Sequence, residues 1–365
     1  MTKINDITRY IERLAPLSSQ ESYDNSGLIV GNQNQEITNV LVSLDCIEST
    51  VDEAIERGCN LIVSHHPIVF RGLKKINGTD YIQRTILKAI KNDIAIYACH
   101  TNLDNYRFGV NYEIAERLGL ADVRILSPKL NVLNKLVCYV PRSHVKVVSE
   151  AMYKAGAGNI GDYSECSFSV SGEGMFTPGE NSSPHIGEIG KSTNVQEERF
   201  EVVCSSHQLD AILNAMRLSH PYEEIAYDVL PLMNANDYEG SGMVGDLTKA
   251  MDEVAFLTFL KSTFNCAVIR HSKLSGGQIK KVAFCGGSGS FLLPAAKRSG
   301  ADVFITGDYK YHDFFDAENE IIIADIGHFE SEQYTSNRIA TILKKKFTTF
   351  AVHLTEVNTN PINYF

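Results

Sequence analysis

Two adjacent histidines, His65 and His66, follow a run of apolar residues and precede Pro67. Imidazole nitrogens bind divalent metal ions, so this pair is a candidate for half of a metal site. Pro67 disfavours the helical conformation for His66 and favours an extended one. Because neighbouring side chains of an extended chain point to opposite sides, the two rings suit two neighbouring ions, or one ion and a substrate. Taken alone, the pair also fits a solvated loop after a strand.

Three further segments place imidazole or carboxylate groups after an apolar run. These groups are His100 and Asp104 after residues 94–99, Asp308 and His312 after residues 302–306, and His328 and Glu332 after residues 320–325. If a helix begins near His328, then His328 and Glu332 lie on one face at i and i+4, a spacing suited to chelation. The alternatives are that Glu332 is an acid favoured at a helix start and that His328 is a core or surface histidine.

Strand-like and helix-like patterns alternate around these groups. The predicted strands are residues 40–44, 61–63, 94–99, 281–285, 302–306 and 320–325, and the predicted helices are residues 4–14, 47–57, 81–92, 254–264 and 291–298. Such alternation predicts mostly parallel sheets covered by helices on both faces. Ligands gather at the carboxyl ends of strands in such sheets, and all four groups of polar residues fall there. This coincidence favours one shared site.

The middle of the chain follows a different order. We predict strands at 132–140, 166–176, 200–204 and 225–230, helices at 144–154 and 208–218, and a polar loop at 177–197. The order β-α-β-β-α-β is that of a ferredoxin-like unit. The predicted fold class is therefore α/β, with mostly parallel sheets flanked by helices and an inserted ferredoxin-like α+β domain. The predicted domains are residues 1–129 with His65, His66 and Asp104, the insertion at 130–232, and residues 233–365 with His328 and Glu332.

Composition excludes several classes of protein. The 365 residues are 44% hydrophobic and 21% charged, as in an ordinary globular protein. The net charge of -10 argues against a nucleic-acid partner bound through its phosphates. No apolar run reaches the length of a membrane span, and the start of the chain lacks the apolar core of a signal peptide, so we expect a cytoplasmic protein without a membrane partner. The eight cysteines include no C-x-x-C pair and are expected to be reduced core residues.

The candidate ligands are imidazoles and carboxylates without a thiolate. This donor set suits zinc, manganese, iron or a similar divalent ion. The donors are too many for one four-coordinate metal with an open position, and they suit two metals bridged by a carboxylate and a water.

A glycine turn at Gly286, Gly287, Ser288 and Gly289 has two interpretations. Its amides could bind a phosphate, or it is a plain tight turn, since the dinucleotide and P-loop fingerprints are both incomplete.

Several motifs occur together in order. They are Asp24-Asn25-Ser26-Gly27-Leu28, Ser64-His65-His66-Pro67, His100-Thr101-Asn102-Leu103-Asp104, Thr306-Gly307-Asp308 with His312, Asp325-Ile326-Gly327-His328 with Glu332, and the glycine turn. Over residues 1–127 and 235–365 the chain thereby resembles the GTP cyclohydrolase type 2-like family of dinuclear-metal proteins, related to the Ngg-interacting-factor proteins. The resemblance implies the metal ligands His65, His66, Asp104, His328 and Glu332, with one carboxylate bridging two ions. It places His100, Asp308 and His312 behind the ligands or facing a substrate.

The resemblance also implies an activity and an assembly. Two divalent ions, zinc in first place, would generate a hydroxide near neutral pH. That hydroxide would open the imidazole ring of a GTP-like nucleotide at C8 with loss of formate. His100 or His312 would carry a proton, and the glycine turn would hold the triphosphate. The insertion is similar to PII-type and CutA-type folds, and members of the family form toroidal homohexamers.

Two other functions are compatible with the sequence. In the first, the protein is regulatory or handles metals, its insertion senses a small molecule, and its metal ions are structural. Structural ions are fully ligated, whereas catalytic ions keep an open position for water. In the second, the protein is a nucleic-acid or transcription-linked partner, which the acidic composition disfavours.

Overall fold

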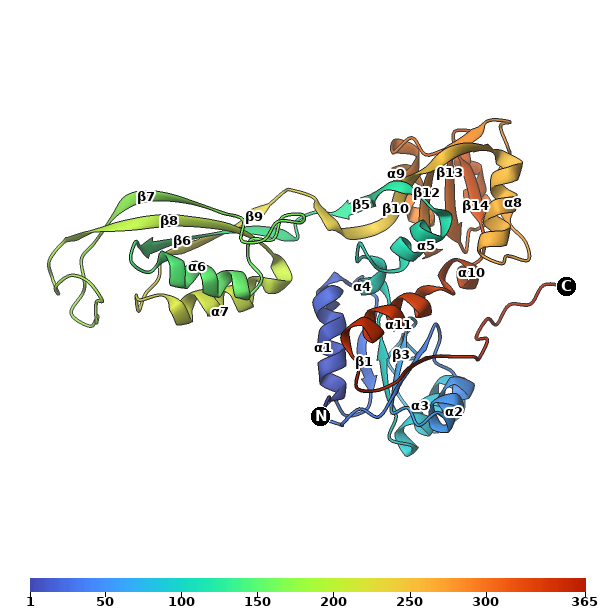
Figure 1. Ribbon diagram of the computed structural model, residues 1–365, viewed down its shortest axis with the longest axis horizontal. Helices are drawn as coiled ribbons and strands as arrows, with labels where there is room; N and C mark the ends of the chain where they lie inside the picture. Colours follow the sequence, from blue (N-terminus) through green and yellow to red (C-terminus); the bar gives the residue numbers. More distant parts are fainter. The chain divides into compact units, whose positions relative to one another are not determined.

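The computed structural model describes residues 1–365. The chain forms two compact units, one from residues 1–128 and 237–365 and the other from residues 129–236. The first unit contains two sheets, and the second contains one (Figure 1). None of the helices combines the length and the apolar character needed to cross a membrane.

The first sheet has the strand order β1-β4-β3-β2-β15. Its strands are β1 (Gly27–Val30), β2 (Val40–Ser43), β3 (Leu61–Ser64), β4 (Ala95–Ala98) and β15 (Val352–Leu354). Strands β15, β2, β3 and β4 are parallel, and only β1 is antiparallel. Ser43 pairs with Ser64, and Ser64 with Ala98, so these three strands end side by side. The residues that follow β3 and β4 therefore share one edge.

Helices cover both faces of this sheet. Helices α1 (Ile4–Leu14) and α11 (Thr335–Lys346) pack on the face that carries Val40 and Val42. Helices α2 (Glu48–Glu56) and α3 (Tyr81–Lys91) pack on the other face, which carries Leu41. Because both faces are buried, the parallel strands read as continuous apolar runs in the sequence.

The second sheet has the order β11-β14-β13-β12-β10-β5. Its strands are β5 (Ala121–Lys129), β10 (Asn236–Asp252), β11 (Arg270–His271), β12 (Gln278–Ser288), β13 (Val303–Gly307) and β14 (Ile322–Asp325). Strands β12, β13 and β14 are parallel. Helices α5 (Val110–Leu118) and α8 (Glu253–Thr263) pack on one face. Helix α9 (Leu293–Arg298) and the 3-10 helix η4 (His312–Ala317) pack on the other.

Short elements complete the first unit. They are η1 (Leu17–Ser19), α4 (Thr101–Asp104), η3 (Ser290–Leu292) and α10 (His328–Glu332). Helix α10 begins at His328, which meets the condition under which His328 and Glu332 share one face. The strands β1, β5, β10, β11 and β15 were not predicted from the sequence.

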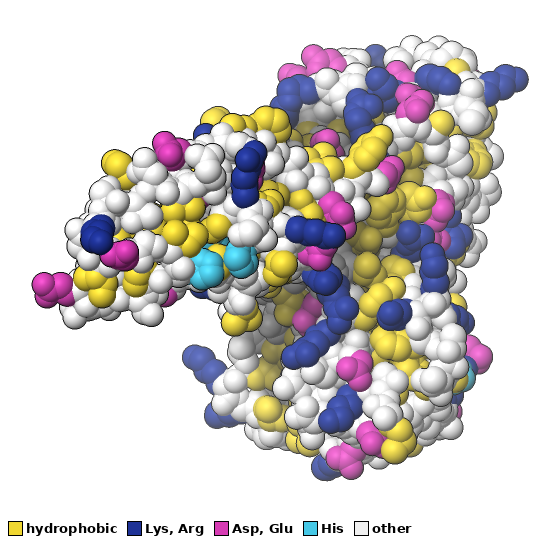
Figure 2. All heavy atoms as spheres, turned by 60° about the vertical axis from the view of Figure 1, so that its left-hand side comes forward, with side chains coloured by type: hydrophobic (Ala, Val, Ile, Leu, Met, Phe, Trp, Pro, Cys, Tyr) yellow, Lys and Arg dark blue, Asp and Glu magenta, His cyan; other side chains and the backbone are white.

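The second unit has one antiparallel sheet with the order β7-β8-β6-β9. Its elements are β6 (Leu133–Pro141), α6 (Val145–Lys154), β7 (Ser167–Phe176), β8 (Thr193–Ser205), η2 (Ser206–Gln208), α7 (Leu209–Ser219) and β9 (Tyr227–Leu232). Apart from the short η2, their order is the predicted one. Both α6 and α7 pack on one face of the sheet. Strand β8 starts inside the predicted loop, because four of its first five residues are polar and hide the strand pattern. Figure 2 shows the surface of this unit, where histidine side chains lie beside hydrophobic ones.

Candidate metal centre

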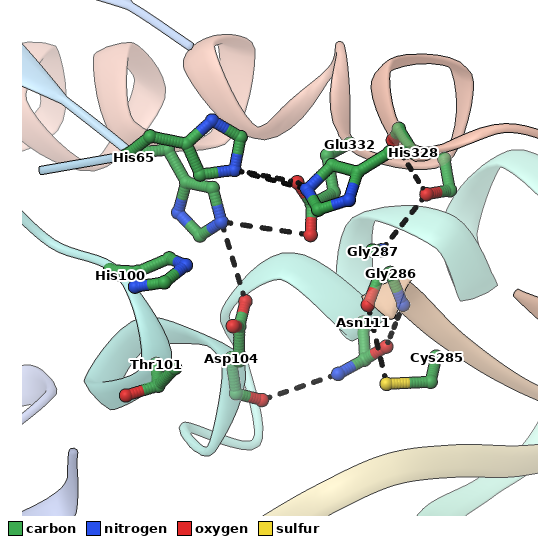
Figure 3. Close-up of polar contacts among 12 residues, drawn as sticks. His65, His100, Thr101, Asp104, Asn111, Cys285, Gly286, Gly287, His328 and Glu332 are labelled. Carbon is green, nitrogen blue, oxygen red and sulfur yellow. Dashed lines mark hydrogen bonds and ion pairs between the residues drawn. The ribbon is translucent and has the colours of Figure 1, made fainter. Parts of the chain in front are cut away.

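Four imidazoles and two carboxylates meet within the first unit, where strands of its two sheets end (Figure 3). His65 follows β3, and His100 and Asp104 follow β4 in the first sheet. His328 and Glu332 follow β14 in the second sheet. The sequence places these groups at strand ends, and the structure shows that the ends belong to two sheets rather than one.

The two adjacent histidines point into the same space. Their ring centroids are 4.8 Å apart, so the expected divergence to opposite sides was wrong. Strand β3 ends at Ser64, and the backbone bends at His65 and His66 instead of staying extended. The rings nevertheless face different oxygens of Glu332. His66 Nε2 lies 3.0 Å from Glu332 Oε2, whereas His65 Nε2 lies 3.8 Å from Glu332 Oε1.

Helix α10 contributes the opposite side of the cluster. His328 Nε2 lies 3.1 Å from Glu332 Oε2, as the i, i+4 spacing predicts. It also lies 3.3 Å from His66 Nε2. His66, His328 and Glu332 therefore converge on one point, although 262 residues separate the two histidines.

Two buried polar atoms at the other end have no hydrogen-bond partner. They are His65 Nε2 and Asp104 Oδ1, which lie 3.6 Å apart. Buried polar atoms are almost always paired, and a role in binding an ion is one of the few explanations for an exception. His65, Asp104 and Glu332 thus form a second convergent group (Figure 3).

Each of the four imidazoles is anchored through its Nδ1 atom. His65 Nδ1 donates to the Cys99 carbonyl at 2.8 Å. The other three Nδ1 atoms pair at 2.7 Å with carboxylates, His66 with Asp45, His100 with Asp24 and His328 with Asp308. Histidine ligands of metals have this arrangement, because the partner fixes the ring and leaves Nε2 for the ion.

The charged groups of the cluster shift one another's pKa values. Burial and the neighbouring Glu332 carboxylate raise the pKa of Asp104 to about 7. Burial alone would raise the pKa of Glu332, but the His328 imidazole beside it holds that pKa well below its usual range. Burial would lower the pKa of His66, yet its hydrogen bonds to Asp45 and Glu332 raise that pKa to about 9. The raised pKa of His66 therefore favours a proton on this ring, where a metal ion would supply positive charge.

The prediction of a turn that starts at Gly286 was wrong, because β12 continues to Ser288. The glycines of this segment make room for Glu332, and their amides are already paired. Gly286 N donates to Asn111 Oδ1, Gly287 N to Ser331 Oγ, and Gly289 N to Thr306 Oγ1. With these amides already paired, the phosphate-binding interpretation of Gly286, Gly287, Ser288 and Gly289 loses its physical basis. A Cβ on Gly287 would overlap the Glu332 carboxylate, so a side chain at this position would displace it.

The structure does not bring every predicted residue into the cluster. His100 is included, with its ring centroid 5.3 Å from that of His65. Asp308 lies behind His328. His312 is exposed on η4, where its ring packs against Tyr311 and Phe315, so the interpretation of His312 as a proton carrier gains no support from its position.

Two carboxylates of the cluster were not assigned from the sequence. Asp45 is the second residue after β2, and its other oxygen accepts a hydrogen bond from Thr359 Oγ1 at 2.6 Å. Asp24 also accepts hydrogen bonds from Thr101, through the amide at 2.9 Å and the hydroxyl at 2.5 Å. The position of Asp45 after a strand next to β3 was the available indication in the sequence.

The residues present fit a pair of divalent ions. One group of donors is His66, His328 and Glu332, and the other is His65, Asp104 and Glu332, with His100 beside both His65 and His66. The donors are nitrogen and oxygen atoms, as for zinc, manganese or iron. Burial raises the pKa of the nearby Cys99 and Cys285 thiols, which disfavours thiolate ligation.

Comparisons with known proteins show what this chain is similar to. Residues 2–361 match the family model described as Duf34/NIF3 (NGG1p interacting factor 3). A Bacillus subtilis protein named GTP cyclohydrolase 1 type 2 homolog is 38% identical over 363 residues, which is 98% of this chain and 97% of that protein. A protein of the same name from Halalkalibacterium halodurans is 40% identical and covers 98% of each chain.

Solved structures show the same fold. A Bacillus cereus protein related to NIF3 has a TM-score of 0.87 and 35% identity, and the match covers 100% of this chain and 99% of that one. A Staphylococcus aureus protein has a TM-score of 0.79 and 30% identity over the same shares of the two chains.

Proposed function

Because this chain belongs to the Duf34/NIF3 family, we propose that it is a hydrolase that uses two divalent metal ions and acts on a nucleotide or a related heterocycle. The names of its curated relatives suggest a reaction of the GTP cyclohydrolase 1 type. The observation that carries the proposal is the position of Glu332, whose two carboxylate oxygens face two different groups of donors.

His65, His66, Asp104, His328 and Glu332 would hold the two ions, and Glu332 would contribute to both groups of donors. Zinc is our first assignment, ahead of manganese and iron. When bound, such a pair of ions activates a water molecule as a nucleophile and polarises the bond under attack.

The protein's own groups would position and move a proton. Asp24 holds Nδ1 of His100 at 2.7 Å, and the His100 ring lies 5.3 Å and 5.4 Å from the rings of His65 and His66. We therefore assign to His100 the role of carrying a proton between substrate and solvent. Asp45 and Asp308 would keep the rings of His66 and His328 oriented.

The first test is metal content by elemental analysis of protein purified without a chelator or a histidine tag. We expect about two ions per chain in the wild type, and fewer in His65→Ala and His328→Ala. His271→Ala is the matched control, because His271 is an exposed histidine on β11 and lies outside the cluster. Wild-type protein without bound metal, and with unchanged melting in a chelator, would overturn the dinuclear assignment.

The second test concerns activity. Metal-loaded protein is incubated with GTP and other purine nucleotides, and released formate is measured. Glu332→Gln should abolish formate release while the far-ultraviolet circular dichroism spectrum stays unchanged. Formate release that is the same with and without metal would exclude the proposed chemistry.

The insertion and the assembly form a separate part of the proposal. We infer a ferredoxin-like, PII/CutA-like domain from the β-α-β-β-α-β order and the strand order β7-β8-β6-β9. We also propose a toroidal homohexamer in the cytoplasm. Light scattering should give six times the chain mass of 40.5 kDa, and any other mass in dilute solution would exclude that assembly.

A further inference from the structure

A cavity of about 500 Å³ lies wholly within the second unit. Phe200 and Val202 of β8 face the helices, so the alternate residue Glu197 lies on the opposite face of the sheet. Tyr139 pairs with Arg199 in register, which places Tyr139 on this same open face. The cavity forms at the end of the open face, where residues 177–186 and 222–226 contribute the remaining walls. Its volume is that of a small-molecule site.

Aromatic rings form much of the wall. Tyr139, Phe176, His185 and Tyr222 all line the cavity. The Tyr222 ring centroid lies 6.2 Å from that of Phe176 and 6.3 Å from that of His185. Three rings therefore surround one space and present π-faces or edges to its contents.

Three carboxylates complete the wall, and no lysine or arginine lines it. Glu197 Oε1 accepts a hydrogen bond from the Tyr222 hydroxyl at 2.9 Å. Gly174 leaves room for the Glu197 carboxylate, since a Cβ there would overlap it. Glu223 is held by the amide of Ser183 at 2.7 Å, and Glu224 is exposed. Arg199, the strand partner of Tyr139, forms an ion pair with Glu201 at 3.0 Å.

We propose that this cavity binds an aliphatic ammonium compound of the polyamine type. The aromatic ring faces and the carboxylates would both attract a cation. The aliphatic part of the compound would pack against Phe176 and the neighbouring Met175. This inference is independent of the metal centre and gives the insertion a ligand of its own.

Other occupants fit the cavity less well. An anion would meet three carboxylates and no cationic side chain of lysine or arginine. A metal ion is less suited, because the cavity offers one imidazole, His185, and its donors do not converge as those of a metal site do. None of the groups of side chains that could hold a metal ion includes a residue of this cavity.

The test is isothermal titration of the full chain with spermidine, and with 1,8-octanediol as an uncharged compound of similar length. We expect saturable binding of one spermidine per chain and none of the diol. Glu197→Gln should weaken spermidine binding about tenfold and Phe176→Leu about threefold, because they remove a charge and a ring. Glu224→Gln is a second charge variant at an exposed wall position, and it should weaken binding about threefold even if Glu197→Gln fails to fold.

The net charge of -10 attracts polyamines without a specific site, so the control must change the charge equally. Glu188→Gln serves this purpose, because Glu188 is exposed in the same loop, pairs with Lys191 and does not line the cavity. Binding to Glu188→Gln should stay within about twofold of wild type. Equal weakening in Glu188→Gln and Glu197→Gln would overturn the proposal, as would the absence of saturable spermidine binding or equal binding of the diol.

Discussion

Replacing Gly287 with alanine should remove the metal ions although it changes no ligand. Gly287 has a φ of 60°. An added Cβ would overlap Glu332 Oε1 and would lie 3.2 Å from Glu332 Cδ and 3.3 Å from His328 Cε1. Ordinary van der Waals contact begins at 3.4 Å, so the Glu332 oxygen must move by about 1 Å. Because ligand distances hold to within about 0.2 Å, this shift takes the oxygen out of coordination.

The assay is elemental analysis combined with competition against a chelator of known affinity. We expect the metal affinity of Gly287→Ala to fall by at least about 100-fold, since even contacts behind a ligand contribute 10-fold to 100-fold. The positive φ adds a loss of about 1 to 2 kcal/mol in the free energy of unfolding. Urea unfolding of the metal-free proteins measures that part separately.

Gly119→Ala is the matched control. Gly119 has a φ of 62°, and a Cβ there would meet no heavy atom within 4 Å. This variant should lose the same free energy of unfolding because of its positive φ, but it should keep both metal ions. Wild-type affinity in Gly287→Ala would refute the argument, and so would an equal loss of metal in Gly119→Ala.

Three further predictions concern the support of the site and the stability of the fold. Asp45→Asn removes the charge behind His66 and should lower metal affinity about tenfold in chelator competition, whereas an unchanged affinity would show that Asp45 does not orient the ring. Hydrogen bonds from Ser275 and from the amides of residues 275–277 lower the pKa of Glu253 to about 2. The ionised Glu253 carboxylate therefore stabilises the fold above pH 4.5, and this stabilisation is lost as the pH falls through about 2. Glu253→Gln should therefore be less stable than wild type at pH 7 and lose less stability between pH 5 and pH 2, and parallel curves from urea unfolding would contradict this. Ile212→Ala removes a fully buried side chain from the core of the second unit and should cost about 2 to 5 kcal/mol in urea unfolding, so a loss below about 1 kcal/mol would contradict the packing.

The sequence predicted the parts of the fold with the simplest patterns. Strands β3, β4, β13 and β14 are buried on both faces and appear as short apolar runs with polar residues after them. Strand β15 has three residues and is held by pairing with β2, which lies far away in the sequence. Such a strand has no local pattern long enough to identify it.

In the site, too, contacts between residues close in sequence could be predicted, whereas contacts between distant residues could not. His328 and Glu332 are four residues apart, so their shared face follows from helix geometry. Asp24 and His100 are 76 residues apart, and Asp45 and His66 are 21 apart. No spacing rule connects such pairs, because the fold alone brings them together. The glycine turn was ambiguous for a different reason, since its sequence does not reveal that other side chains occupy its amides.

The pairing of His66 with Glu332 has a consequence for folding. The two residues are 266 positions apart, and the whole insertion lies between them in the chain. An ion held by both would close a very long loop, as a disulfide does, and would restrict the unfolded chain accordingly. During synthesis the first sheet emerges with His65, His66 and Asp104 but without Glu332 and without β15. On the proposed function, metal capture would therefore be a late event that locks together two parts of the chain made at different times.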